Sequence, residues 1–383
     1  MKPGPLAAVA VLCASLGTSQ LVAQQAEAPP FWDYTYTPYG YYSSIDGWWL
    51  AGLVRVYSPI GFRERPEPFR AAITLSGGGS TQGSYLVELD AQAPALWDGW
   101  RVGLTLDALR ANRLGYFGTG NNSAYDKDSA TAGNPYFYKV SRTSQLARLH
   151  LQRRIVGPLR VLVGATVEHT SFRVLPGDGL FARDRAAGAA DSTPFDDAAL
   201  RAGLVVDTRD NELDPHAGVF AEALVTGARS YSRTTIGAQA YVHPFEKLVL
   251  AGRVLGERMS GAPSVSVMQA IESSGRPYIG VGGYRSLRGY YDSRFIGPDK
   301  LLAGVEARFA VLYAPTLFEL KLVGFYDVGR VFPAGGLGLT TRDLHSSAGG
   351  ELMLRLGRNG ILVAGAGFGE DGGQFLFGTT WSY

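Results

Sequence analysis

The sequence predicts an all-β chain that forms a transmembrane antiparallel β-barrel. After the first 23 of its 383 residues, no apolar run approaches the length that a membrane-spanning helix needs. From about residue 47 onward, segments of about ten residues alternate in polarity and are separated by turns, as in barrels of the bacterial outer membrane. Glycine (50) and tyrosine (20) are abundant, which suits strands and turns. A secreted soluble sandwich is the competing interpretation.

Residues 1–28 have the pattern of an export signal. Lys2 gives a positive start, an apolar core runs from Leu6 to Leu16, and small residues offer cleavage points at Ala23, Ala26 and Ala28. We therefore predict a signal peptide over 1–28 and an outer-membrane barrel over 29–383.

The only cysteine, Cys13, lies within this predicted signal. Leu12 before it is too large for the usual lipoprotein cleavage pattern, so we expect no lipid anchor. The mature chain then has no disulfide and no thiolate metal site.

Strand-like segments account for most of the chain after residue 47. Together with the last ten residues they number fifteen, and the other fourteen are 47–57, 69–76, 82–91, 99–109, 136–155, 159–172, 198–208, 217–229, 232–242, 246–258, 300–311, 318–330, 346–356 and 360–369. Short and long connections largely alternate, as expected for short periplasmic turns and longer external loops.

An exported chain should enter its barrel from the periplasm, which requires one more strand. Phe31–Tyr42 is the best candidate, because Trp32, Tyr34 and Tyr36 alternate. A break inside the overlong 136–155 is the rival, and either choice gives sixteen strands, an even number. Fifteen strands would stand only if the first stretch threads the lumen.

The C-terminal strand is the clearest case of alternation. Four aromatic residues share one parity, and we expect this face to meet lipid: Phe375, Phe377, Trp381 and Tyr383. The terminal aromatic residue also resembles the C-terminal signal of outer-membrane barrels.

The long connection at 260–299 contains an unusual stretch, Val281–Tyr291, with three glycines, two arginines and three tyrosines. In the strands that follow, alternation points Glu306 and Asp327 into the lumen. An arginine fork suits two such carboxylates better than a lysine does. We infer that Arg288 enters the lumen and is held by these acids; ordinary lumen polarity is the alternative.

Four motifs resemble those of the BamA/TamA outer-membrane assembly family, also called bacterial surface antigens. Leu287-Arg288-Gly289-Tyr290 is similar to the family's Arg-Gly-aromatic loop, and residues 325–329 to its Phe-x-Asp-x-Gly strand. Residues 116–121 look like a loop of its shorter members. Its strand-and-turn signature is matched by Asp207, Arg209, Asp210, Pro215 and Gly218. The resemblance implies a sixteen-stranded barrel whose arginine loop folds inward against acidic strands, here Arg288, Gly289 and Tyr290 against Asp327 and Glu306.

The chain departs from this family before the barrel. Typical members carry periplasmic substrate-binding domains there, whereas only about twenty residues separate the predicted signal from the first clear strand. Fewer than about 40 residues rarely fold unaided, so we expect no such domain.

Other kinds of function find less support in the sequence. A net charge of +2 gives no argument for nucleic acid. The five histidines have no metal spacing, and no nucleophile motif marks the Ser-His-acid site of an outer-membrane lipase. The acids of 207–214 lack the spacing of a calcium loop, which favours turn-capping and salt-bridging roles.

We therefore expect no enzyme, no cofactor and no metal, but an assembly or translocation barrel acting on proteins or lipids. Its expected partners are outer-membrane lipids and a separate periplasmic protein. A passive or plugged pore without assembly activity is the alternative.

Overall fold

A computed structural model describes residues 31–383, apart from 44–45, 61–64, 191–193 and 315–316. The predicted signal peptide lies outside the described residues.

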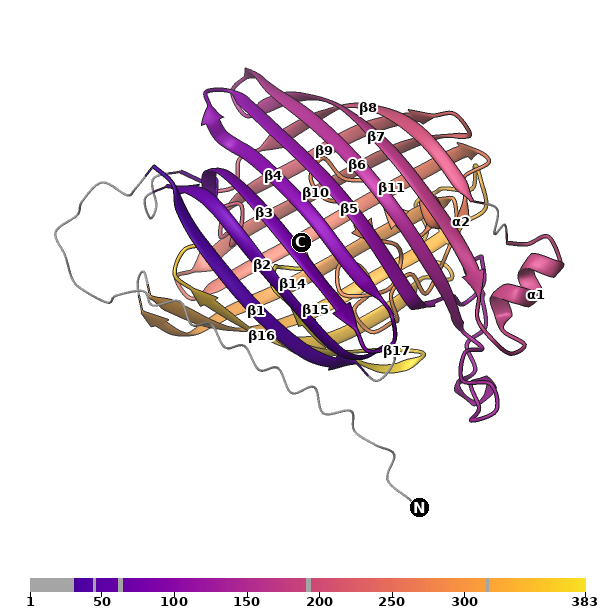
Figure 1. Ribbon diagram of the computed structural model, residues 1–383. Helices are drawn as coiled ribbons and strands as arrows, with labels where there is room; N and C mark the ends of the chain where they lie inside the picture. The colour runs from indigo at the N-terminus through magenta and orange to yellow at the C-terminus, as the bar shows by residue number, and fades with distance from the viewer. Residues whose placement is uncertain (1–30, 44–45, 61–64, 191–193, 315–316) are drawn as a thin grey trace.

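Sixteen strands form one antiparallel sheet, and each of the sixteen pairs with the next of them along the chain. Figure 1 shows the sheet curling into a barrel, with the long loops drawn inside and at one end. The strands are β1 (Asp33–Ser43), β2 (Gly47–Pro59), β3 (Phe69–Ser80), β4 (Tyr85–Trp97), β5 (Trp100–Gly115), β6 (Lys139–Val156), β7 (Leu159–Val174), β8 (Phe195–Asp207), β9 (Gly218–Ala228), β10 (Tyr231–Phe245), β11 (Leu248–Gly261), β14 (Asp299–Ala314), β15 (Phe318–Phe332), β16 (His345–Leu356), β17 (Gly360–Gly369) and β18 (Gly372–Gly378).

The predicted count of sixteen strands is confirmed, and β1 is the additional strand. It pairs with β2 from Asp33–Tyr57 to Ser43–Gly47. The rival prediction of a break inside 136–155 is wrong, because β6 runs unbroken over 18 residues. The first stretch therefore forms a strand of the wall.

The strands expose apolar side chains outward and bury charged ones inward, the reverse of a soluble protein. Outward residues on nine of the strands are Leu50, Ile73, Val163, Leu200, Val225, Ile236, Leu322, Leu352 and Phe375. Buried inward ones include Arg148, Arg201, Glu222, Arg233, Glu257, Glu306, Arg308, Asp327 and Glu351. This arrangement fits a barrel surrounded by hydrocarbon and excludes a soluble sandwich.

The connections distinguish the two ends of the barrel. The four longest lie at one end, after β5, β7, β11 and β15, and we assign this end to the outside. The start of β1 and the end of β18 share the opposite end, which is then periplasmic.

Short elements occur within the long connections: a 3-10 turn at Lys127–Ser129, α1 (Leu180–Ala186), α2 (Val265–Met268), β12 (Ala270–Ile271) and β13 (Tyr278–Ile279). No helix in the described part of the chain is long and apolar enough to cross a membrane.

The connection between β11 and β14, residues 262–298, fills the lumen and is called here the lumen loop. Its apolar residues form a buried cluster with the inner faces of β11, β14 and β15: Leu255, Ile271, Tyr278, Val281, Leu287, Tyr290, Phe295, Leu302 and Val331. Isolated bridges join Val281 to Phe295 and Gly120 to Ile296, so the loop is tied to itself and to the external loop after β5.

The C-terminal strand differs from its prediction. Phe375 and Phe377 are exposed outward as expected, but the ladder with β17 ends at Gly378. The last five residues, called here the C-terminal tail, turn into the lumen, where Trp381 and Tyr383 are buried. The prediction that these two aromatic residues meet lipid is therefore wrong.

Polar partners inside the barrel explain why the tail turns inward. The indole Nε1 of Trp381 donates to Asp214 over 3.1 Å, and the Arg308 guanidinium lies 3.8 Å from the Trp381 ring centroid. Ser382 donates to Glu306, and Arg308 donates to the Tyr383 carbonyl. Lipid offers no hydrogen-bond partner to the polar groups of the tail. Phe375 and Phe377 have no polar side-chain group, so they can remain on the outer surface.

Candidate functional site: the lumen loop and its anchors

Strand register brings the two predicted acids onto one inner surface. Gly304 of β14 faces Asp327 of β15, and Glu306 faces Phe325. Because side chains alternate along a strand, Gly304, Glu306 and Arg308 all point inward, as do Phe325 and Asp327. Gly304 leaves room for Asp327, since a Cβ there would lie 2.6 Å from its Oδ1.

Arg288 of the lumen loop reaches this surface and is fully buried. Its Nε and Nη2 donate to the two carboxylate oxygens of Asp327 over 2.8 and 2.9 Å. Its Nη1 donates to Glu306 over 2.6 Å. The guanidinium carbon also lies 3.6 Å from the ring centroid of Phe325, so the plane of the fork rests on an aromatic face.

Glu351 of β16 is a third acid at Arg288, 3.5 Å from Nη1, and sequence reasoning missed it. Arg308 pairs with Glu306 at 2.7 Å, and Arg253 lies 3.6 Å from Asp327. Three guanidinium groups thus meet three carboxylates. Burial lowers the pKa of Arg288, but Glu306 and Asp327 outweigh this and raise it, so the charge persists.

The two residues after Arg288 fix the loop against β17. A Cβ on Gly289 would lie 2.4 Å from the Phe368 carbonyl carbon and 2.6 Å from the Gly369 nitrogen. The Tyr290 hydroxyl accepts from the Glu370 backbone N–H, and its ring packs against Phe295. Arg288, Gly289 and Tyr290 therefore join the loop to β14, β15, β16 and β17; we call this set, with Glu306, Asp327 and Glu351, the clasp.

Replacing Gly289 by alanine is expected to destabilise the barrel, because the contacts that the new methyl meets are backbone atoms of β17. Overpacking of this kind costs about 1–3 kcal/mol. Urea unfolding of the purified barrel in detergent measures this loss of stability. Gly227→Ala is the matched control, since nothing lies within 4 Å of a Cβ there; equal effects of the two changes would contradict the close approach.

A second anchor lies at the other end of the lumen loop and was not predicted. Glu272 is buried and accepts from Arg148 of β6 and Arg201 of β8, each over 2.9 Å. Arg233 of β10 lies 3.7 Å away. Burial raises the pKa of Glu272, but Arg148, Arg201 and Arg233 outweigh it and lower this pKa to about 2.

The predicted strand-and-turn motif occupies the β8–β9 connection. Arg209 donates a hydrogen bond to each carboxylate oxygen of Asp207 over 2.9 Å. Asp210 accepts from the backbone N–H groups of His216 and Ala217. Pro215 is buried, and Gly218 has a φ of +108°, where a side chain would be strained. The turn is thereby fixed in shape.

From this turn, two acids reach across the lumen. Glu212 pairs with Arg101 of β5, and Asp214 accepts from Lys321 of β15 over 2.8 and 2.7 Å. The turn therefore braces the periplasmic end of the lumen from inside.

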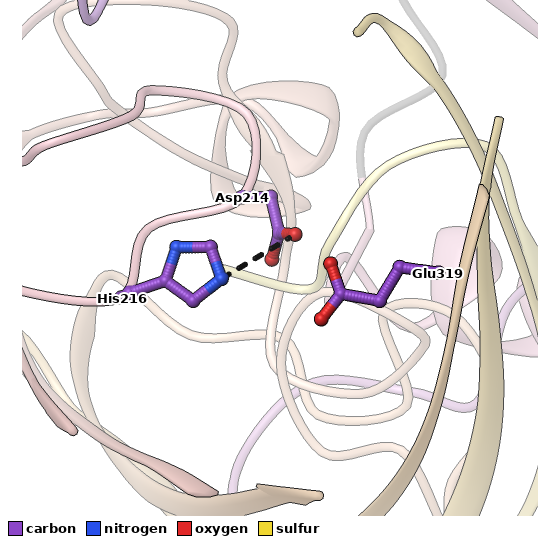
Figure 2. Close-up of side chains that lie close together, drawn as sticks. All are labelled: Asp214, His216 and Glu319. Atoms are coloured by element: carbon purple, nitrogen blue, oxygen red, sulfur yellow. Dashed lines mark ion pairs between the residues drawn. The ribbon is translucent and has the colours of Figure 1, made fainter. Parts of the chain in front are cut away.

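One group of side chains has the composition of a metal site. Figure 2 shows Asp214, His216 and Glu319 close together. Their possible ligand atoms lie within 4.8 Å of one another. The Lys321 ammonium, however, lies 3.5 Å from Glu319 as well as against both oxygens of Asp214. Arg355 donates to Glu319 over 3.0 Å. These cations already neutralise the carboxylates, so the group fits an ion-pair network better than a divalent metal.

The predicted loop at 116–121 closes over the lumen loop from outside. Phe117 stacks on Tyr291 with ring centroids 5.3 Å apart, and Tyr116 is buried against Phe181 of α1. Asn121 accepts from the Val331 backbone N–H of β15. Positive φ angles at Gly118 and Gly120 allow this path.

Comparison with known proteins agrees with the barrel fold. The model of the Omp85 superfamily domain matches residues 70–364. The chain belongs to the Omp85 superfamily. It is an outer-membrane β-barrel of that superfamily, which confirms the predicted fold class, the predicted location and the resemblance to the BamA/TamA family. No curated protein matches it.

Solved structures with the same fold include two kinds of Omp85 barrel. BamA from Haemophilus ducreyi lacking POTRA domains 1–3 has 15% identity and a TM-score of 0.56 over 91% of this chain and 69% of its own. CdiB from Escherichia coli has 13% identity and a TM-score of 0.55 over 92% of this chain and 60% of its own. This Omp85 chain therefore spans less than two thirds of CdiB.

Proposed function

We propose that this Omp85 barrel assists the insertion or transport of proteins or lipids at the outer membrane, and that it acts without enzymatic chemistry. The observation that carries the proposal is the pair of sheet edges at β1 and β18. Within the described residues, β1 pairs with β2 alone and β18 with β17 alone. Unpaired strand edges offer backbone N–H and C=O groups to an incoming strand.

The place where the β1 and β18 edges meet, called here the seam, is weak because β18 is short. It has seven residues against eleven in β1, and the chain leaves the sheet after Gly378. Seven residues of β18 can pair with only part of β1, and the C-terminal tail supplies its polar groups to the lumen instead. We infer that a client strand or a lipid meets the barrel at this seam.

The filled lumen supports this proposal over a passive pore. The clasp, the Glu272 anchor and the C-terminal tail all occupy the interior that an open channel would leave to water. A plugged barrel without assembly activity is the remaining alternative, and it predicts a seam that never opens.

Two kinds of partner belong to the proposal. Outer-membrane lipids would contact the apolar outer surface, which is continuous over the strands. A separate periplasmic protein would deliver the client to the end of the barrel where β1 begins and β18 ends.

A reversible crosslink across the seam tests the proposal. One cysteine is placed in β1 and one in β18, using a panel of pairs; the sole natural cysteine, Cys13, lies in the predicted signal. We expect liposomes containing the reduced protein to accelerate insertion of a small reporter barrel. Oxidation should abolish the acceleration and a reductant should restore it.

Single-cysteine variants are the controls and should respond to neither treatment. Stable ion conductance without any acceleration by the reduced protein would refute the assembly function. Full activity of the oxidised, crosslinked protein would refute the role of the seam.

A further inference from the structure

A cavity of about 680 Å³ lies at the periplasmic end of the lumen, between the lumen loop and the β8–β9 turn. The C-terminal tail forms part of its wall. Its lining is rich in cations and contains two acids, Asp207 and Glu212. The five lining arginines are Arg101, Arg160, Arg209, Arg276 and Arg285.

Four of these arginines have a carboxylate within ion-pair distance. Arg101 pairs with Glu67 and Glu212, and Arg209 pairs with Asp207. Arg160 lies 4.0 Å from Asp207, and Arg276 contacts Glu88. Their charges are therefore balanced, at least in part, by the protein itself.

Arg285 is the exception among the residues that the structure describes. Its guanidinium carbon lies 4.2 Å from the ring centroid of Tyr278, and its buried Nε has no acceptor. Two further cations, Arg253 and Arg276, act on it electrostatically. Burial lowers the pKa of Arg285. The Tyr278 and Tyr284 side chains oppose this shift in part, and the two arginines add to it.

A half-buried cation without a counter-ion is costly, and a bound anion would remove that cost. The Tyr278 ring lies against the guanidinium, and no hydrogen bond from the Arg285 side chain to a described residue uses its two Nη groups, so these groups can donate to a ligand. Arg276 lines the same cavity with 61% of its side chain accessible, so it can leave its pair with Glu88 and turn toward the same anion.

We propose that this cavity binds a phosphate-bearing ligand through Arg285, with Arg276 as the second cation. Two guanidinium forks offer more donors than the two oxygens of one carboxylate accept, whereas a phosphate monoester presents three terminal oxygens. The ligand is either free phosphate or a monoester phosphate carried by a lipid headgroup that enters from the periplasmic side. This site does not depend on the proposed insertion activity.

Thermal unfolding of the full mature chain in neutral detergent, followed by tryptophan fluorescence, tests the site. Inorganic phosphate, glycerol 3-phosphate and acetate are compared at equal ionic strength. We expect both phosphates to raise the midpoint in a saturable way and acetate to have no such effect. A larger rise with glycerol 3-phosphate would identify the headgroup as the source, and an equal rise would identify free phosphate.

Arg285→Gln should weaken phosphate binding by about tenfold or more. Without phosphate, this variant should unfold no earlier than the natural protein, because it removes an uncompensated charge; this separates binding from folding. Arg154→Gln is the matched control, since Arg154 is exposed and pairs with Asp98 outside the cavity. Equal stabilisation of Arg285→Gln and the natural protein would overturn the proposal, as would an equal response to acetate or no response to either phosphate.

Discussion

Replacing Arg288 by alanine is expected to lower the free energy of unfolding of the barrel by about 3–5 kcal/mol, because it leaves buried charges without their partner. Asp327 loses two hydrogen bonds from one fork and Glu306 loses its 2.6 Å bond. Arg308 and Arg253 remain near these acids and limit the loss. Urea unfolding and the temperature of the gel-mobility shift measure the effect.

Two further variants separate charge from geometry at this position. Arg288→Lys keeps the charge but cannot bind both oxygens of Asp327 in the same plane, so it should fall between alanine and the natural residue. Arg154→Ala breaks an exposed pair with Asp98 and should cost no more than about 1 kcal/mol. An Arg288→Ala protein that unfolds like the natural one would show that the clasp does not hold the lumen together.

The sequence was sufficient to predict the barrel because the pattern that indicates a barrel strand is local in the sequence. Alternation with period two identifies inward residues without knowledge of the fold, and it places Glu306, Arg308, Phe325 and Asp327 on the side where the structure has them. The same rule applied to β16 would have placed Glu351 inward as well. The additional strand β1 followed from the topology of an exported chain.

The sequence could not predict features that depend on where a strand ends or how a loop packs. Alternation continues through Trp381 and Tyr383, but the β17 ladder stops at Gly378, so these residues meet Arg308 and Asp214 instead of lipid. Glu272 lies in a loop without periodicity, and three separate strands supply its arginines. Only their closure into one barrel brings these charges together.

Opposite charges hold the two ends of the lumen loop. Arg288 carries a cation to the acids of β14, β15 and β16, while Glu272 carries an anion to the arginines of β6, β8 and β10. The loop therefore links the N-terminal and C-terminal halves of the wall across the lumen. Because each anchor depends on a different set of strands, each can be tested without removing the other.

Replacing Glu272 by glutamine is expected to destabilise the barrel at pH 7 by about 3–5 kcal/mol, since Arg148 and Arg201 lose their carboxylate while their packing is kept. Arg233 keeps a carboxylate, Glu257, 3.8 Å away. Glu370→Gln is the matched control, because Glu370 is exposed and its one ion pair among the described residues is with the ring of His345. Urea unfolding compares the three proteins.

The pH dependence of stability shows whether Glu272→Gln acts by removing a charge or by disturbing the packing of the loop. The folded pKa of Glu272 is lowered from 4.5 to about 2. Its contribution to stability is therefore fully present above pH 4.5 and is lost as the pH falls toward 2. The difference between the natural protein and Glu272→Gln should stay constant from pH 7 to pH 5 and shrink below 4.5. A difference that persists unchanged to pH 2 would mean that glutamine disrupts the packing of the loop and that the carboxylate charge does not anchor it.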